Sequence, residues 1–126
     1  MSEQKKILIV DDEPNILLSL EFLMKKNHYE VFIARDGAEA MQIIEQEVPN
    51  VIILDIMMPK VDGFEVCEFV KAAEALKHIK IIFLTAKSKE SDIKRGYDVG
   101  ADLYVTKPFS TRNLLQQVKE ITHKHS

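Results

Sequence analysis

Short apolar segments alternate with longer amphipathic segments along the whole chain, and this alternation limits the fold more than any other feature. Five runs rich in β-branched residues predict strands over residues 6–10, 29–34, 51–54, 80–84 and 102–105. The runs at 7–10, 51–54 and 81–84 are apolar throughout, which is typical of strands covered on both faces. The second and fifth runs are more mixed, so we expect them nearer the edges of the sheet.

The segments between these strands have the spacing of amphipathic helices. Their apolar positions are Ile16, Leu17, Leu20, Leu23 and Met24, then Ala38, Met41 and Ile44, then Phe64, Cys67, Val70 and Ala73, then Leu114, Leu115, Val118 and Ile121. Pro14 falls in the first turn of the first helix, and Gly100 follows the fourth helix as a stop signal. Asp36 and Ser110 are placed to cap the second and fifth helices. Strict alternation predicts an α/β fold with a parallel sheet, right-handed crossovers and helices on both faces.

The size of the chain predicts one domain. With 126 residues it is long enough to bury a single core, and no linker, repeat or low-complexity tract interrupts it. We expect residues 1–126 to form that domain, with a core over about 5–122. The last helical pattern runs almost to the final residue, so we expect no output domain after it.

Charge and cysteine content exclude several classes of function. The net charge of −3 gives no sign of a nucleic-acid or anionic-membrane surface. The apolar run at 7–10 is too short for a signal peptide or a membrane span. Cys67 is the single cysteine, which predicts a reducing cytoplasm. Its neighbours Phe64 and Val70 on the same helical face indicate inert packing rather than redox chemistry.

Polar side chains gather at the carboxyl ends of the expected strands. Asp11 and Asp12 follow the first strand, Asp55 follows the third, Thr85 ends the fourth, and Lys107 comes after the fifth. Side chains at the carboxyl ends of parallel strands converge on one crevice, where ligands bind. We therefore expect three acids, one hydroxyl and one lysine at the same end of the sheet.

Three carboxylates at one place need a compensating cation. An all-oxygen set completed by water and substrate phosphate is how Mg²⁺ is usually held, and Mn²⁺ could replace it. No Cys or His stands near these positions, which disfavours zinc. An aspartate beside such an ion can attack phosphorus and form an acyl phosphate. Lys107 and Thr85 then supply a positive charge and a hydroxyl donor for the phosphoryl oxygens.

Four sequence motifs resemble those of the response regulator receiver domain of two-component signalling. They are ILIVDDE at 7–13, ILDIMMPKVDG at 53–63, FLTAK at 83–87 and GADLYVTKPF at 100–109. They occur in the family's order and cover essentially the whole chain. The resemblance implies a flavodoxin-like, doubly wound sheet of five parallel strands in the order 2-1-3-4-5 with five helices.

The same resemblance implies a role for each polar residue. Asp55 would be the phosphoacceptor and, with Asp12 and the main-chain carbonyl of Met57, a magnesium ligand. Asp11 resembles the acid that acts on the ion through water and holds Lys107. Pro108 follows Lys107 as in the family, where that peptide bond is typically cis.

The resemblance also implies a switch. Thr85 is similar to the hydroxyl that moves to the phosphoryl oxygen, and Tyr104 to the aromatic ring that turns inward with it. A histidine kinase or a histidine phosphotransfer protein would supply the phosphoryl group. A face made of the fourth helix, the fifth strand and the fifth helix, roughly residues 89–121, would then report to an effector. The product would be a changed surface, so the resemblance implies a signalling switch with self-phosphorylating and self-dephosphorylating activity rather than an enzyme.

The sequence departs from the family pattern or leaves it undetermined at a few positions. Leu103 stands where many DNA-binding relatives carry a second acid, which weakens any claim to their charge-paired dimer face, and dimerisation is left open. Met57 and Lys87 occupy positions that tune the lifetime of the phosphoryl group, and their side chains do not translate into a rate. His123 and His125 read as a solvated tail, and Asp62 with Gly63 as a turn into the third helix.

Each functional interpretation competes with a simpler one. Asp11 and Asp12 could merely cap the first helix, Thr85 could be an ordinary strand residue, and Lys107 could be a solvated loop lysine. A second possible function is a constitutive docking module that keeps the pocket without being phosphorylated. Such a module would not need all three acids together with the threonine and the lysine. A flavin-binding protein of this fold would need a Ser/Thr/Gly-rich phosphate loop where this chain has Asp-Asp-Glu-Pro.

Overall fold

The computed structural model describes residues 4–123 and contains ten alternating elements. The strands are β1 (Lys6–Val10), β2 (Glu30–Ala34), β3 (Val51–Leu54), β4 (Lys80–Thr85) and β5 (Leu103–Thr106). The helices are α1 (Pro14–Lys26), α2 (Gly37–Glu47), α3 (Gly63–Ala72), α4 (Glu90–Asp98) and α5 (Thr111–His123). All five expected strands are therefore present, each within one residue of its expected bounds.

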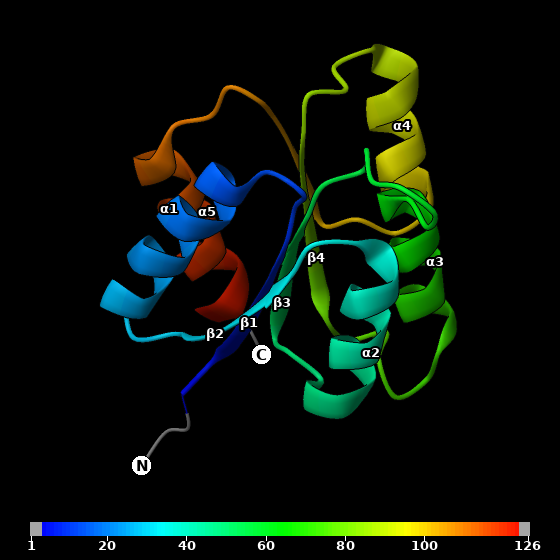
Figure 1. Cartoon of the computed structure of the whole chain (residues 1–126). Coiled ribbons are helices and arrows are strands. Elements are labelled where there is room, and N and C mark those ends of the chain that lie inside the picture. The colour runs from blue at the N-terminus through cyan, green and yellow to red at the C-terminus, as the bar shows by residue number, and fades with distance from the viewer. Residues whose placement is uncertain (1–3, 124–126) are drawn as a thin grey trace.

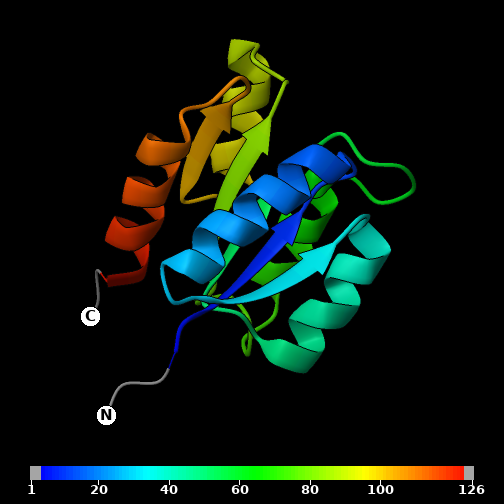
Figure 2. The same cartoon turned by 60° about the vertical axis from the view of Figure 1, so that its left-hand side comes forward.

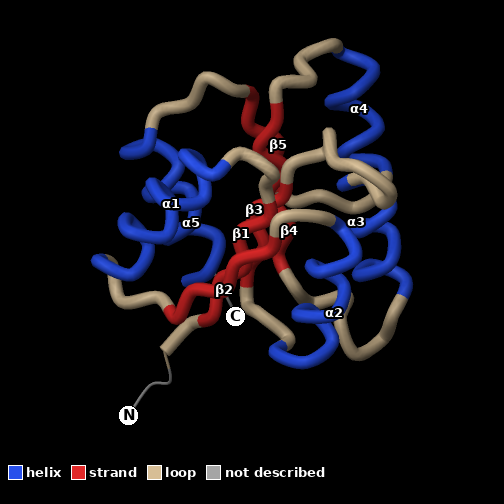
Figure 3. Tube along the Cα trace, in the orientation of Figure 1, coloured by secondary structure: helices blue, strands red, loops and turns tan. Residues whose placement is uncertain are grey.

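The strands form one parallel sheet in the order β2-β1-β3-β4-β5. Helices α1 and α5 cover one face, and α2, α3 and α4 cover the other (Figures 1 and 3). Turning the molecule brings the fan of strands into view, with β2 and β5 at its two edges (Figure 2). This confirms the flavodoxin-like topology and the edge positions expected for the second and fifth strands.

Alternate residues of the central strands lie in two separate hydrophobic cores, one on each face of the sheet. Leu8 and Val10 of β1 belong to the core under α2, α3 and α4, whereas Ile7 and Ile9 belong to the core under α1 and α5. Side chains on successive strand residues point to opposite faces, so a strand covered on both sides must be apolar at every position. All residues of β3 and residues 7–10 of β1 are buried, as the uninterrupted apolar runs predict.

The helix starts follow the expected punctuation. Pro14 opens α1, and the Asp36 side chain accepts a hydrogen bond from the Glu39 amide at 2.8 Å. The Ser110 hydroxyl oxygen accepts one from the Asn113 amide at 3.2 Å at the start of α5. These bonds satisfy backbone donors that have no partner inside the helix.

Two details differ from the expectation or complete it. Ala38 is exposed, whereas Gly37, Ala40 and Ile44 are the buried residues of α2, because the helix begins with Gly37 against Val61 and the next residue turns outward. Gly100 follows α4 with a φ of 113°, in the left-handed region that favours glycine. His123 is exposed at the end of α5, and His125 lies outside the described residues. Within residues 4–123, no helix combines the length and the apolar character needed to cross a bilayer.

Candidate functional site

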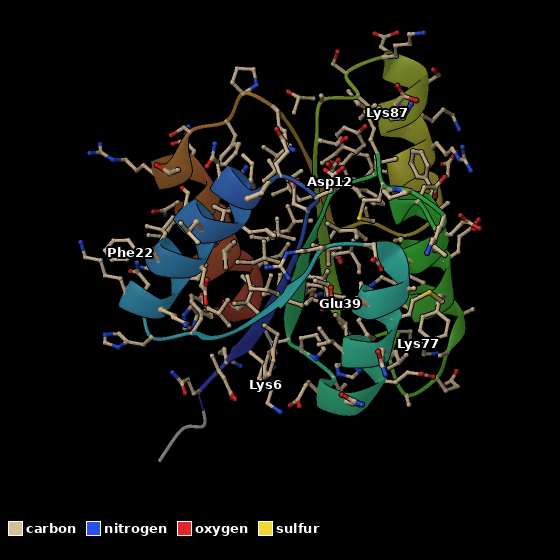
Figure 4. The ribbon with its side chains drawn as sticks, viewed as in Figure 1. Lys6, Asp12, Phe22, Glu39, Lys77 and Lys87 are labelled. Atoms are coloured by element: carbon tan, nitrogen blue, oxygen red, sulfur yellow. The ribbon has the colours of Figure 1, made fainter. Side chains whose placement is uncertain are left out.

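Three carboxylates meet at the carboxyl end of the sheet. Val10 of β1 pairs with Leu54 of β3, so the residues that follow, Asp11 and Asp55, leave the sheet side by side. One carboxylate oxygen from each of Asp11, Asp12 and Asp55 lies within 4.8 Å of the others. Asp11 and Asp55 are 2% and 5% exposed, whereas Asp12 faces solvent. Asp12 and Lys87 mark this end in Figure 4, far from Lys6 at the start of β1.

Lys107 joins this acidic group from the loop after β5. Its Nζ lies 3.0 Å from Asp11 Oδ2 and 3.4 Å from Asp55 Oδ2, and its side chain is 14% exposed. The cis peptide bond between Lys107 and Pro108 is present, as the resemblance implies. The structure thus brings together all the acids and the lysine that the sequence predicted.

Glu13 also belongs to this group, and the sequence analysis did not single it out. Its Oε1 lies 2.7 Å from Lys107 Nζ, which is shorter than the distance to either aspartate. The Glu13 amide donates to Asp11 Oδ1 at 2.9 Å. The only signal in the sequence was that Glu13 is the third acid in a row. A glutamate at the start of a helix is usually a solvent-exposed residue, so this signal was weak.

The environment shifts the ionisation of the two buried partners in this cluster. Burial raises the pKa of Asp11, and the nearby charge of Asp55 adds to this, while hydrogen bonds from the Glu13 amide and from Lys107 oppose it. Burial alone would lower the pKa of Lys107, but its bonds to Glu13 and Asp11 and the charge of Asp55 outweigh burial and raise that pKa. Lys107 therefore stays charged, and one ammonium group cannot neutralise four carboxylates.

The donor set fits a hard divalent cation. Every candidate ligand is an oxygen, the three aspartates converge, and the cluster keeps an excess of negative charge after Lys107 is counted. These are the properties of sites that hold Mg²⁺ with a few carboxylates and leave the remaining positions to water or phosphate. Among the described residues, the group of candidate ligands at this place contains no cysteine or histidine.

The loop between β3 and α3 brings backbone groups beside Asp55. The Met57 amide donates to Asp55 Oδ1 at 3.3 Å, while the Met57 side chain is 54% exposed. Gly63 starts α3 against the backbone of Asp55, where an added Cβ would lie 2.4 Å from the carbonyl oxygen of Asp55. Asp62 caps this helix through reciprocal bonds with Glu65, which confirms the expected turn at 62–63.

Thr85 and Tyr104 are linked through the backbone of Lys87. Thr85 is completely buried at the end of β4, and its hydroxyl oxygen accepts a hydrogen bond from the Lys87 amide at 3.4 Å. The Tyr104 hydroxyl donates to the Lys87 carbonyl at 2.8 Å. Burial, with the charges of Asp92 and Asp55, raises the pKa of Tyr104 to about 12, so this phenol remains a donor.

Comparison with known proteins identifies the family. Residues 7–119 match the family described as response regulator receiver domain. The chain belongs to this family. Members are phosphorylated on aspartate in two-component signalling, and this receiver domain carries the acidic group that the family uses.

Solved structures of other receiver domains are similar over nearly the whole chain. A CheY-like receiver domain protein of Methanospirillum hungatei is 33% identical, with a TM-score of 0.89, 95% of this chain and 94% of that one covered. A chemotaxis protein of Vibrio cholerae is 31% identical, with a TM-score of 0.88 and coverage of 94% and 99%. The BeF₃-activated receiver domain of DrrB is 31% identical, with a TM-score of 0.88 and coverage of 97% and 100%.

Cys67 takes no part in this site. It is fully buried in α3, as its helical position predicted, and its thiol points to the Val99 carbonyl at 3.6 Å. Burial raises the pKa of Cys67 to about 12, which keeps the thiol protonated and unreactive.

Proposed function

We propose that this receiver domain takes a phosphoryl group onto Asp55 with the help of Mg²⁺, and thereby switches a surface that a partner protein reads. The observation that carries the proposal is the convergence of Asp55 with Asp11, Asp12 and Lys107 at one end of the sheet. A histidine kinase or a histidine phosphotransfer protein would be the donor. The single cysteine is buried and forms no disulfide, which is compatible with a protein that functions in the reducing cytoplasm.

The transfer would use the residues of the site in distinct roles. An Asp55 carboxylate oxygen attacks phosphorus, the bond from phosphorus to the donor's nitrogen breaks, and the electron pair stays on that nitrogen. Asp12, Asp55 and the main-chain carbonyl of Met57 would hold Mg²⁺, with Asp11 acting through water. The bound ion would offset the charge of the phosphoryl oxygens. Lys107 would donate to one of those oxygens, and the Met57 amide is placed to donate to Asp55.

The switch would run from Thr85 to α4 and β5. The new charge on Asp55 attracts the Thr85 hydroxyl, which then gives up its bond with the Lys87 amide. Because Tyr104 holds the carbonyl of the same Lys87, a shift there reaches the ring of Tyr104 on β5. An effector that binds the shifted α4, β5 and α5 face more tightly than the resting one would receive the signal.

Helix α1 offers a surface for a protein donor. Leu18 and Phe22 lie four residues apart on its outer face, and each is 70% exposed. Phe22 points away from the sheet in Figure 4. The helix begins just after the acidic residues 11–13, so a protein that covers this ridge brings its own phosphorylated side chain near Asp55.

Intact-mass measurement after incubation with acetyl phosphate and Mg²⁺ tests the proposal. We expect the wild-type chain to gain one phosphoryl group, and Asp55→Asn to gain none because its amide cannot attack phosphorus. Omission of Mg²⁺ should also prevent the gain. The BeF₃-activated state of DrrB supports the use of beryllofluoride as a stable mimic in binding experiments. A wild-type chain that gains no mass, or an Asp55→Asn chain that does, would contradict the proposal.

A constitutive docking module of the same fold is the alternative function. It would bind its partner equally well with and without beryllofluoride, and Asp55→Asn would leave that binding unchanged. The buried acids argue against it, because ionised carboxylates that lack full compensation destabilise a fold and are kept where they serve a purpose.

A further inference from the structure

Asp11, Glu13 and Lys107 form a closed ring of interactions. The Glu13 amide donates to Asp11 Oδ1 at 2.9 Å, and this bond fixes the direction in which the Glu13 side chain leaves the backbone. Glu13 Oε1 then accepts from Lys107 Nζ at 2.7 Å, and the same Nζ donates to Asp11 Oδ2 at 3.0 Å. Asp11 therefore orients both of its neighbours, one with each carboxylate oxygen.

Together with Asp55, the two acids of this ring match the three donors of Lys107. A lysine ammonium has three N–H donors, and Lys107 has three carboxylate partners, with Asp55 as the most distant at 3.4 Å. If two donors are held by Asp11 and Glu13, the third can point only toward Asp55. A lysine on a flexible four-carbon stem is not otherwise confined to one orientation.

The Glu13 carboxylate has no other structural task in the described part of the chain. Glu13 stands at the N-cap of α1, yet its side chain makes no capping hydrogen bond. Its backbone carbonyl begins the helix by accepting from the amides of Ile16 and Leu17. The Glu13 side chain is 59% exposed, so it lies at the rim of the cluster, and its ion pair is with Lys107.

We propose that Glu13 is a positioning residue for phosphoryl transfer, which holds the Lys107 ammonium so that one N–H faces the oxygen of Asp55 and the phosphoryl group attached there. The inference rests on the proposed function of Asp55. Glu13 acts through Lys107 and not on phosphorus, so its contribution should depend on the reach of its side chain and should disappear when Lys107 is absent.

The first experiment measures the hold on Lys107 without any phosphorylation. In the resting protein, ¹⁵N NMR follows the exchange of the Lys107 ammonium protons with water. We expect Glu13→Ala to accelerate that exchange several-fold. Glu21→Ala is the matched control, because it removes a carboxylate of α1 that also pairs with a lysine, Lys25 at 2.9 Å, away from the site. Equal exchange in wild type and Glu13→Ala would overturn the proposal.

The second experiment compares rates of phosphorylation by acetyl phosphate at saturating Mg²⁺. Glu13→Ala should be slower by about tenfold, the scale on which loss of one charge-assisted hydrogen bond acts. Glu13→Gln keeps an oxygen acceptor of the right reach and should lie between wild type and Glu13→Ala. Glu13→Asp keeps the charge but is one methylene too short, so it should be as slow as Glu13→Ala.

A double-mutant cycle separates positioning from a general charge effect. In a Lys107→Ala background, Glu13→Ala should cause no further loss of rate. Wild-type rates in Glu13→Asp, or an equal loss from Glu13→Ala with and without Lys107, would overturn the positioning role. If the wild-type chain takes up no phosphoryl group while ammonium exchange responds to Glu13, the proposed function fails and the hold on Lys107 stands.

Discussion

Val48 ends α2 in a conformation that suits few side chains. Its φ of 46° and ψ of 67° lie in the left-handed region, where a β-branched residue is disfavoured more than most. Its amide donates to the Ile44 carbonyl at 2.9 Å and closes the last turn of the helix, so the conformation is required by the chain path. The backbone conformation at this position is therefore unfavourable for valine.

Replacement of Val48 by glycine should stabilise the fold. We expect Val48→Gly to raise the free energy of unfolding by about 1 kcal/mol, because the left-handed conformation disfavours a side chain by roughly that amount. Urea unfolding of both chains measures the difference. Val48→Ala serves as control, since it removes the same methyl groups but keeps a Cβ. Equal stability of the glycine and alanine variants would show that the conformation carries no such penalty.

Sequence reasoning found the site residues that end strands and missed one that does not. Asp11, Asp55 and Thr85 are signalled by position, because a polar residue at the end of a buried strand or directly after it must lie at the rim of the sheet. Glu13 has no such marker. Its part in the cluster depends on a turn closed by Asp11 and on a lysine far along the chain, and no local pattern records either contact.

At the scale of elements, Gly96 sets how closely α4 approaches β5. A Cβ at this position would lie 2.7 Å from Cδ2 of the Tyr104 ring and 3.2 Å from Cδ2 of Phe83. The two rings pack against each other with centroids 5.8 Å apart, so a Cβ at position 96 would have to displace this packed pair. Tyr97 on the next helical position accepts a hydrogen bond from the Tyr104 amide at 3.1 Å and fastens the same contact.

Alanine at Gly96 should therefore destabilise the domain although alanine favours helices. We expect Gly96→Ala to lower the free energy of unfolding by about 1–3 kcal/mol, as overpacking usually does. Ser91→Ala on the exposed side of α4 is the control and should have little effect. Removal of the ring in Tyr104→Ala should abolish most of the penalty. The same loss with and without the Tyr104 ring would place the cause elsewhere.

The order of elements was predictable, whereas the buried face of one helix was not. Uninterrupted apolar runs located β1, β3 and β4, because a strand covered on both faces is apolar at nearly every position, whereas β2 and β5 were located by more mixed, β-branched runs. The face of α2 was assigned wrongly at Ala38, since alanine is tolerated inside and outside and gives a weak periodic signal. The strand order came from the family resemblance, because alternation alone is compatible with several parallel orders.

For the whole molecule, the acidic site opposes the stability of the core. Two buried cores and five helices pack around the sheet, yet Asp11 and Asp55 are held nearly out of water beside each other with Lys107 as the shared cation. Burial raises the pKa of Asp11, so ionising this group is harder in the folded chain than in the unfolded one. A bound divalent ion would reverse that balance, which couples folding, pH and metal.

The sign of this coupling gives the final prediction. Because the folded pKa of Asp11 is raised above 3.8, the folded chain binds more protons than the unfolded one as pH rises from that value, and its stability falls. Asp11→Asn should not show this fall in stability, because asparagine does not ionise. Without Mg²⁺, the stability of Asp11→Asn relative to wild type should increase with pH, from near pH 4 until Asp11 is ionised in the folded state. Lys107 contributes stability that persists until pH rises above 10.5, so it does not mask the effect.

Urea unfolding measures how the stability difference depends on pH and on the metal. Wild type and Asp11→Asn are compared across this pH range, with and without saturating Mg²⁺. The ion should stabilise wild type more than Asp11→Asn at neutral pH, because it binds the ionised cluster, and should close or reverse the gap. Glu45→Gln, on the exposed side of α2, is the control for loss of one negative charge. A gap between wild type and Asp11→Asn that stays constant with pH would mean that Asp11 ionises equally easily in both states. If Mg²⁺ does not change the stability difference between wild type and Asp11→Asn, then Asp11 takes no part in metal binding.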